Sequence, residues 1–99
     1  MDDQTLKTIR DVFAQQPIEK AWLFGSYSRG EESPTSDIDL LVVFDRSEKP
    51  VTLLTYATIW RTLQERLGRN VDLVEEGTLR PAVVKTANND KVLIYERKN

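Results

Sequence analysis

The 99-residue sequence contains no cysteine and no histidine. Without cysteine it has no disulfide, no thiolate nucleophile and no cysteine-based zinc site. Without histidine it has no Ser-His-Asp triad, and the most common general base near neutral pH is missing. Any catalysis must therefore depend on carboxylates, hydroxyls, lysine, arginine or a metal ion held by oxygen ligands. Carboxylate oxygens select hard cations such as magnesium or manganese.

The sequence also lacks a long apolar run and a basic cluster. The longest apolar run, Leu40 to Phe44, is far shorter than the roughly 20 residues of a membrane-spanning helix. The chain starts with Met1, Asp2 and Asp3 rather than with the basic residues of a secretory signal. We therefore expect a cytoplasmic protein that does not enter a membrane. The net charge of −2 argues against direct nucleic-acid binding, which usually needs a basic face.

Length and hydrophobic periodicity predict one α+β domain that spans residues 1–99. Apolar residues make up 39% and charged residues 30% of the chain, as in folded globular proteins. Helices and strands are expected in the order α-β-α-β-α-β-α, followed by a short extended segment, 92–95. This order indicates a small mixed sheet with helices on one face and the other face free to hold chemistry. The predicted strands are 21–24, 37–44 and 70–74, and the first, third and last helices start near residues 2, 53 and 78.

Two of the helices have a predicted inward face. The third helix is expected to end at Gly68, a typical stop signal. Tyr56 and Trp60 allow a second interpretation as a base-stacking platform, but their spacing favours packing against the core or a partner. The inward residues are Leu6, Ile9, Val12 and Phe13 in the first helix and Leu53, Tyr56, Trp60, Leu63 and Leu67 in the third.

Three aspartates are predicted to share one face of the sheet. Asp37 and Asp39 alternate along one strand, so their carboxylates point the same way, about 7 Å apart along the backbone. Val71 and Leu73 face inward in a later strand, so Asp72 faces outward. If the two strands are neighbours, the carboxylates lie together and can hold two metal ions about 4 Å apart. The alternatives are a solvated strand edge and a lone surface aspartate.

Gly25 and Ser26 lie where a predicted strand ends and a brief helix begins. Glycine lets a phosphate approach the backbone, and free N–H groups at a helix start attract anions. Arg29 lies about one turn after Ser26, so its guanidinium can reach the same phosphate. An ordinary turn and a surface salt bridge of Arg29 with Glu31 or Glu32 are the alternatives.

Segments 23–30 (LFGSYSRG) and 36–42 (SDIDLLV) resemble the signature of the DNA polymerase beta-like nucleotidyltransferase superfamily. Within it, the chain is similar to the minimal nucleotidyltransferases, single-domain proteins often called MNT antitoxins. The likeness extends to 71–74 and 92–95, and Ser28 replaces a common alanine. The resemblance implies the nucleotidyltransferase fold and assigns roles to the six residues discussed above. Gly25, Ser26 and Arg29 would bind the triphosphate of ATP, Asp37 and Asp39 would bind Mg²⁺ (two ions, or Mn²⁺), and Asp72 would be the third metal-site carboxylate and the catalytic base.

The resemblance also implies a partner, an all-helical HEPN-domain toxin that some members neutralise by transferring AMP from ATP to a tyrosine. We therefore expect a metal-dependent nucleotidyltransferase that acts as the antitoxin of a toxin–antitoxin pair. The alternative is a binding module that blocks its partner by contact while its nucleotide site is idle. Modification of a small molecule is less favoured because a second domain is missing, and polymerisation because nothing would hold a template.

Overall fold

The computed structural model describes residues 3–24, 37–47, 50–76 and 91–97. The brief helix predicted after Gly25 and the helix predicted to start near residue 78 lie outside these segments. No helix in the described segments is long and apolar enough to cross a membrane. The described elements are α1 (Asp3–Ala14), β1 (Ile18–Phe24), β2 (Ile38–Phe44), α2 (Leu53–Leu67), β3 (Val71–Glu75) and β4 (Val92–Glu96).

The four strands form one mixed sheet in the order β3-β2-β1-β4. β1 pairs antiparallel with both β2 and β4, whereas β2 and β3 are parallel. Parallel strands need a long crossover connection, and α2 provides it between β2 and β3. The α+β prediction and its mixed sheet are therefore confirmed. The predicted extended segment 92–95 is a full edge strand of this sheet.

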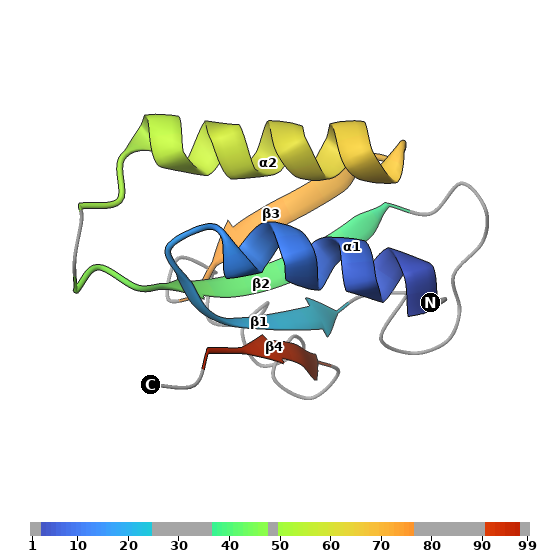
Figure 1. The fold of residues 1–99 in the computed structure, drawn as a ribbon, viewed down its shortest axis with the longest axis horizontal. Helices are drawn as coiled ribbons and strands as arrows, with labels where there is room; N and C mark the ends of the chain where they lie inside the picture. Colours follow the sequence, from blue (N-terminus) through green and yellow to red (C-terminus); the bar gives the residue numbers. More distant parts are fainter. Residues whose placement is uncertain (1–2, 25–36, 48–49, 77–90, 98–99) are drawn as a thin grey trace, which may run out of the picture.

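Both helices pack on the same face of the sheet, and Figure 1 shows α1 across its middle with α2 along the β3 side. Their inward side chains and alternate residues of the strands form a single core. Phe13 of α1 meets Tyr95 of β4 edge to face, with ring centroids 5.9 Å apart. The predicted inward face of α1 is confirmed, since Ile9, Val12 and Phe13 are buried and Leu6 packs against them.

The ends of α2 follow from local chemistry. Thr52 caps its start, because the Thr52 hydroxyl accepts a hydrogen bond from the Thr55 N–H and the Thr55 hydroxyl accepts one from the Thr52 N–H. Gly68 ends the helix with φ 65°, a left-handed conformation that side chains other than glycine rarely adopt. The predicted stop at Gly68 is therefore confirmed.

The predicted inward face of α2 is partly wrong. Leu63 is buried and Tyr56 and Leu67 pack against the core, but Trp60 is 38% and Leu53 is 82% exposed. Because α2 runs antiparallel to β3 and Tyr56 already reaches Leu73, the turn before Tyr56 lies level with the end of β3. Leu53 therefore has no further sheet to cover, and Ile59, which the prediction omitted, is buried instead.

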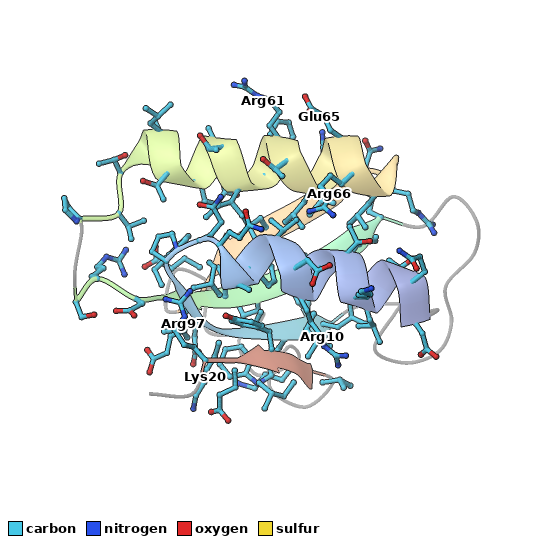
Figure 2. All side chains as sticks on the ribbon, viewed as in Figure 1. Arg10, Lys20, Arg61, Glu65, Arg66 and Arg97 are labelled. Atoms are coloured by element: carbon cyan, nitrogen blue, oxygen red, sulfur yellow. The ribbon has the colours of Figure 1, made fainter. Side chains whose placement is uncertain are left out.

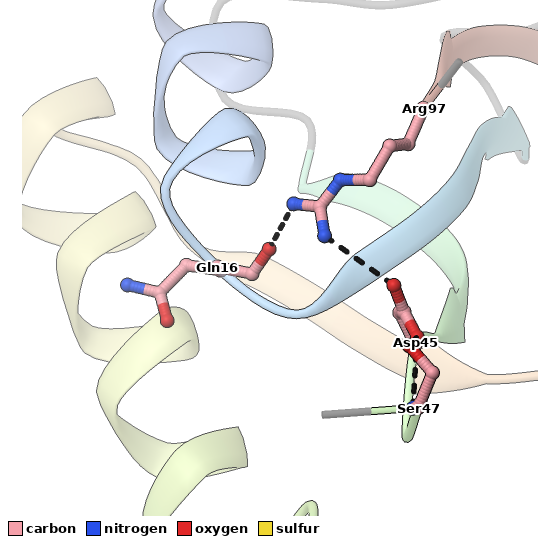
Figure 3. Close-up of polar contacts among 4 residues, drawn as sticks. All are labelled: Gln16, Asp45, Ser47 and Arg97. Atoms are coloured by element: carbon pink, nitrogen blue, oxygen red, sulfur yellow. Dashed lines mark hydrogen bonds and ion pairs between the residues drawn. The ribbon is translucent and has the colours of Figure 1, made fainter. Parts of the chain in front are cut away.

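Two arginine side chains connect β4 to the rest of the fold by donating hydrogen bonds to backbone carbonyls. The β1–β4 register shifts at Ile94, and Arg10 Nε of α1 donates to the Ile94 carbonyl at 2.7 Å. Figure 2 shows Arg10 between α1 and β4. Arg97 Nη2 donates to the Gln16 carbonyl at 2.5 Å, and Arg97 Nη1 lies 3.5 Å from Asp45 Oδ2 (Figure 3). Arg97 thus joins β4, the α1–β1 turn and the end of β2.

Asp45 is expected to make stability depend on acid pH. The Ser47 hydroxyl and N–H donate to Asp45 Oδ1 at 2.6 and 2.9 Å, and these bonds, with the nearby Arg97 charge, lower the pKa of Asp45 below its ordinary 3.8. A lowered pKa contributes stability above pH 3.8, and this contribution is lost as the pH falls through the lower value. Asp45→Asn should therefore lower the melting temperature at pH 7 but change it less at strongly acid pH.

Thermal melts across the acid range test this expectation. The exposed Asp11 of α1 offers a matched control, because Asp11→Asn removes the same charge away from Arg97. A difference between wild type and Asp45→Asn that stays constant down to the lowest pH would contradict a lowered Asp45 pKa, set by the Ser47 hydrogen bonds and the Arg97 charge, as its cause.

Candidate active site

The structure places Asp39 and Asp72 side by side in neighbouring parallel strands. The two residues are register partners in the β2–β3 pairing, and Asp37 directly precedes β2. Neighbouring strands lie about 4.8 Å apart, so the two aspartates start from adjacent backbone positions. Asp37 and Asp72 are exposed and Asp39 is half-buried. The condition on which the predicted site depended, adjacency of the two strands, is therefore met.

The local sequence explains why these carboxylates face away from the core. Ile38 and Leu40 of β2 and Val71 and Leu73 of β3 are buried under the helices, and alternation turns the residues between them to the other face. That face was predicted to be free for chemistry. On that face Asp37 and Asp72 are exposed, but Asp39 is half-buried and Leu41 is only 1% exposed, so the face is only partly free.

The last residue of β1 lies at the end of the sheet that carries the aspartates, which is the edge of the sheet described here. Phe24, the last residue of β1, pairs with Asp39, because β1 runs antiparallel to β2. Phe24 is the residue before Gly25 in the chain. Gly25, Ser26 and Arg29 lie outside the described residues, and their assignment to phosphate binding stays a prediction. In the described sheet, β1 nevertheless ends next to the aspartates.

The donor chemistry of this edge suits a hard divalent cation. Neighbouring carboxylates repel one another, and a cation between them removes that cost. Their oxygens are the ligands that magnesium and manganese prefer. Within the described segments, no three acidic side chains converge on one point. The backbone arrangement is thus defined, and metal binding by Asp37, Asp39 and Asp72 stays a prediction.

Tyr56 of α2 lies close to this edge of the sheet. Its hydroxyl donates a hydrogen bond to the Leu73 carbonyl. Burial, together with the negative charge of Asp72, raises the pKa of Tyr56 above its ordinary 10.0. The phenol is therefore neutral at physiological pH and acts as a hydrogen-bond donor beside the Asp72 strand.

Lys91 is a cation near this end of the sheet that the sequence patterns did not single out. It lies one residue before β4, just beyond the Leu23–Val92 pair, and its Nζ lies 4.3 Å from the centroid of the Trp22 ring. A lysine over an aromatic ring is held by attraction to the ring face. Only the β1–β4 pairing brings Lys91 to β1, and no local motif signals that pairing.

A family model described as polymerase beta, nucleotidyltransferase, matches residues 7–99 of the chain. The protein adenylyltransferase MntA of Thermococcus cleftensis is 35% identical over 88 residues, which are 89% of this chain and 83% of that protein. A solved structure of a candidate minimal nucleotidyltransferase is 34% identical with a TM-score of 0.72, covering 93% of this chain and 95% of its own.

The fold also matches a more distant solved structure. This is a complex of a tri-AMPylated HEPN toxin of Shewanella oneidensis with an MNT antitoxin, and the matched chain is 18% identical with a TM-score of 0.70. The match covers 98% of this chain and 74% of the other. At this identity the comparison shows a shared fold, which agrees with the two helices and mixed sheet described above.

The surroundings of Tyr56 lead to a spectroscopic prediction. The chain has three tyrosines. We expect Tyr56→Phe to remove a phenolate absorbance step that occurs above pH 10.0 in the wild type. Asp72→Asn should move that step to lower pH, because a neutral neighbour no longer opposes a second negative charge. Glu76→Gln is the control, since Glu76 follows the same strand and does not contribute to the Tyr56 pKa. If Asp72→Asn leaves the Tyr56 absorbance step at the same pH, the Asp72 charge does not affect the pKa of Tyr56.

Proposed function

The chain belongs to the polymerase beta nucleotidyltransferase family and is a nucleotidyltransferase, and on that basis we propose the reaction that it catalyses. It transfers AMP from ATP to a tyrosine hydroxyl of a HEPN-type toxin and acts as that toxin's antitoxin. The observation that carries the proposal is the register pairing of Asp39 with Asp72, with Asp37 preceding the same strand. The name of the 35% identical relative and the AMPylated toxin in the distant complex support both the reaction and the partner.

The candidate residues fall into two groups in the proposed reaction. Gly25, Ser26 and Arg29 bind the triphosphate, and Asp37 and Asp39 hold Mg²⁺ or Mn²⁺, with Asp72 as the third carboxylate. When bound, the cations neutralise negative charge on the phosphates as the reaction proceeds. The ion-binding role rests on the hard oxygen donors at this edge of the sheet, and no other residue type is needed for it.

We assign Asp72 as the base that receives the proton of the attacking hydroxyl. The tyrosine oxygen of the toxin forms a bond with the α-phosphorus of ATP, the bond to the β-phosphate oxygen breaks, and pyrophosphate leaves. The phenolic proton passes to the Asp72 carboxylate. In a chain without histidine, an exposed carboxylate at the site is the available base. Positioning the two reactants in line contributes much of the rate in reactions of this kind.

A second candidate function is neutralisation by contact alone. Leu53 and Leu54, in the first turn of α2, are 82% and 74% exposed. Exposed apolar side chains of this size suit a protein contact. In this alternative the antitoxin covers its partner while the nucleotide site is idle, so loss of a carboxylate would leave neutralisation unchanged.

Mg-ATP is expected to stabilise the protein, and the carboxylates are expected to be required for it. A ligand at about a hundred times its dissociation constant adds about 2.7 kcal/mol to the free energy of unfolding. Asp39→Asn should abolish this gain while leaving the metal-free protein as stable or slightly more stable, because it removes a repulsive charge. Thermal melts with and without Mg-ATP measure both effects, and Asp11→Asn on α1 is the matched control. A large loss of metal-free stability in Asp39→Asn would instead indicate a structural role.

AMP transfer should depend on Asp72. We expect Asp72→Asn to keep most Mg-ATP binding but to slow transfer by about 10²-fold or more, because the hydroxyl loses its base. The assay combines the antitoxin, Mg-ATP and the toxin encoded beside it, and reads the toxin's mass and modified residue by mass spectrometry. If the toxin is neutralised while its mass never changes, and Asp37→Asn protects equally well, the contact-only function is correct.

A further inference from the structure

In the part of the chain that the structure describes, side chains of α2 bind the outer edge of β3, and no further strand pairs there. β3 is the last strand of the described sheet, so only its inner edge pairs with β2. At the outer edge, Trp60 Nε1 donates to the Val71 carbonyl at 2.9 Å. The Val71 N–H donates to Gln64 Oε1 at 3.2 Å. Both outward backbone groups of Val71 are therefore satisfied by one helix.

The same helix binds the other residue that flanks Asp72. The Tyr56 hydroxyl donates to the Leu73 carbonyl. Val71 and Leu73 are the two neighbours of Asp72 in the chain, and each is fixed at its outer edge by α2. On the inner side, β3 pairs along its length with β2. Asp72 thus lies between two residues that are held from both sides.

Tyr56, Trp60 and Gln64, here called the edge clamp, are spaced four residues apart and therefore form one stripe along α2. This stripe is separate from the buried residues Ile59 and Leu63, which pack into the core. From the sequence, packing of Tyr56 and Trp60 against the core or a partner was favoured over a stacking platform; in the structure their polar tips bind the β3 backbone. Edge strands expose unpaired N–H and C=O groups, and the clamp covers them on both sides of Asp72.

We propose that the edge clamp consists of positioning residues that hold Asp72 opposite Asp39 for AMP transfer. The inference rests on the proposed function, because it assigns the clamp to the residue that receives the proton. Without the clamp, β3 keeps its β2 ladder and the core packing of Val71 and Leu73, but its outer backbone groups lose their partners on α2 and this edge can fray. A displacement of about 1 Å in a reacting group is enough to slow a reaction by about 10²-fold.

The test uses a double variant, Trp60→Phe with Gln64→Met, that removes both clamp bonds to Val71. It leaves the Tyr56 and Asp72 side chains unchanged, so an effect on transfer is not due to the loss of either side chain and is transmitted through the β3 backbone. Gln64→Met alone is a milder variant in case the double variant is poorly folded. Gln64→Glu, made in the wild-type chain, keeps an acceptor for the Val71 N–H and should match the wild type in Val71 exchange and in transfer rate. Thr52→Ala is the matched control, because it removes the cap of the same helix without touching β3.

Two quantities are measured at a temperature at which every variant is folded. The first is hydrogen exchange at the Val71 amide, which should become about tenfold faster or more in the double variant. The second is the rate of AMP transfer to the toxin from Mg-ATP. The kcat should fall by about tenfold or more, whereas the KM for ATP should change by less than about twofold. Thr52→Ala should lower the melting temperature but leave kcat unchanged.

The outcomes separate this inference from the proposed function. If kcat stays at the wild-type value while Val71 exchange accelerates, the clamp is structural only and the inference is wrong. An equal fall of kcat in Thr52→Ala also overturns it, because general loss of stability then explains the effect. A wild-type protein that never transfers AMP contradicts the proposed function itself, before any clamp variant is compared.

Discussion

The parallel ladder between β2 and β3 is the contact on which the candidate site depends. It runs from the Ile38 N–H, which donates to the Asn70 carbonyl at 3.0 Å, to the Glu76 N–H, which donates to the Val42 carbonyl at 2.8 Å. A slip of one residue would turn every side chain of one strand to the opposite face. Asp72 would then point into the core, which costs free energy for a charged group without a partner. The buried face therefore fixes the register, and the register fixes the carboxylates.

The connection between these strands contributes to the same constraint. α2 crosses from β2 to β3, packs Ile59 and Leu63 into the core, and binds the β3 edge with a separate stripe. A parallel pair at the edge of a small sheet is otherwise open to water or to another chain on one side. α2 thus covers part of the core and also binds the outer edge of β3. The outer charged residues of this helix, including Arg61 and Glu65, point away from the sheet (Figure 2).

The sequence was sufficient to predict the elements whose residues alternate or repeat locally. Strand alternation predicted that Ile38 and Leu40 face inward and the aspartates outward, and glycine chemistry predicted the end of α2. What it did not contain was the relative placement of distant segments. The partner of β4, the overhang that exposes Leu53 and the position of Lys91 all depend on strand order and helix direction, which no local pattern encodes. Gln64 was missed for the same reason, since a half-exposed glutamine on a helix gains its role only from the strand beside it.

Several ion pairs and the candidate aspartates lie at opposite ends of the described sheet. Three ion pairs between described residues lie at the end where β2 and β3 finish: Arg46–Glu75 at 2.7 Å, Arg97–Asp45 at 3.5 Å and Lys20–Glu96 at 3.2 Å. The aspartates lie at the opposite end, where β2 and β3 begin. Like charges placed together weaken a fold, and a small domain has little stability to lose. The opposite charges at the far end offset only a small part of this cost, because these side chains are partly exposed to solvent. The β2–β3 ladder and the buried core, rather than these ion pairs, therefore hold the aspartates at their end of the sheet.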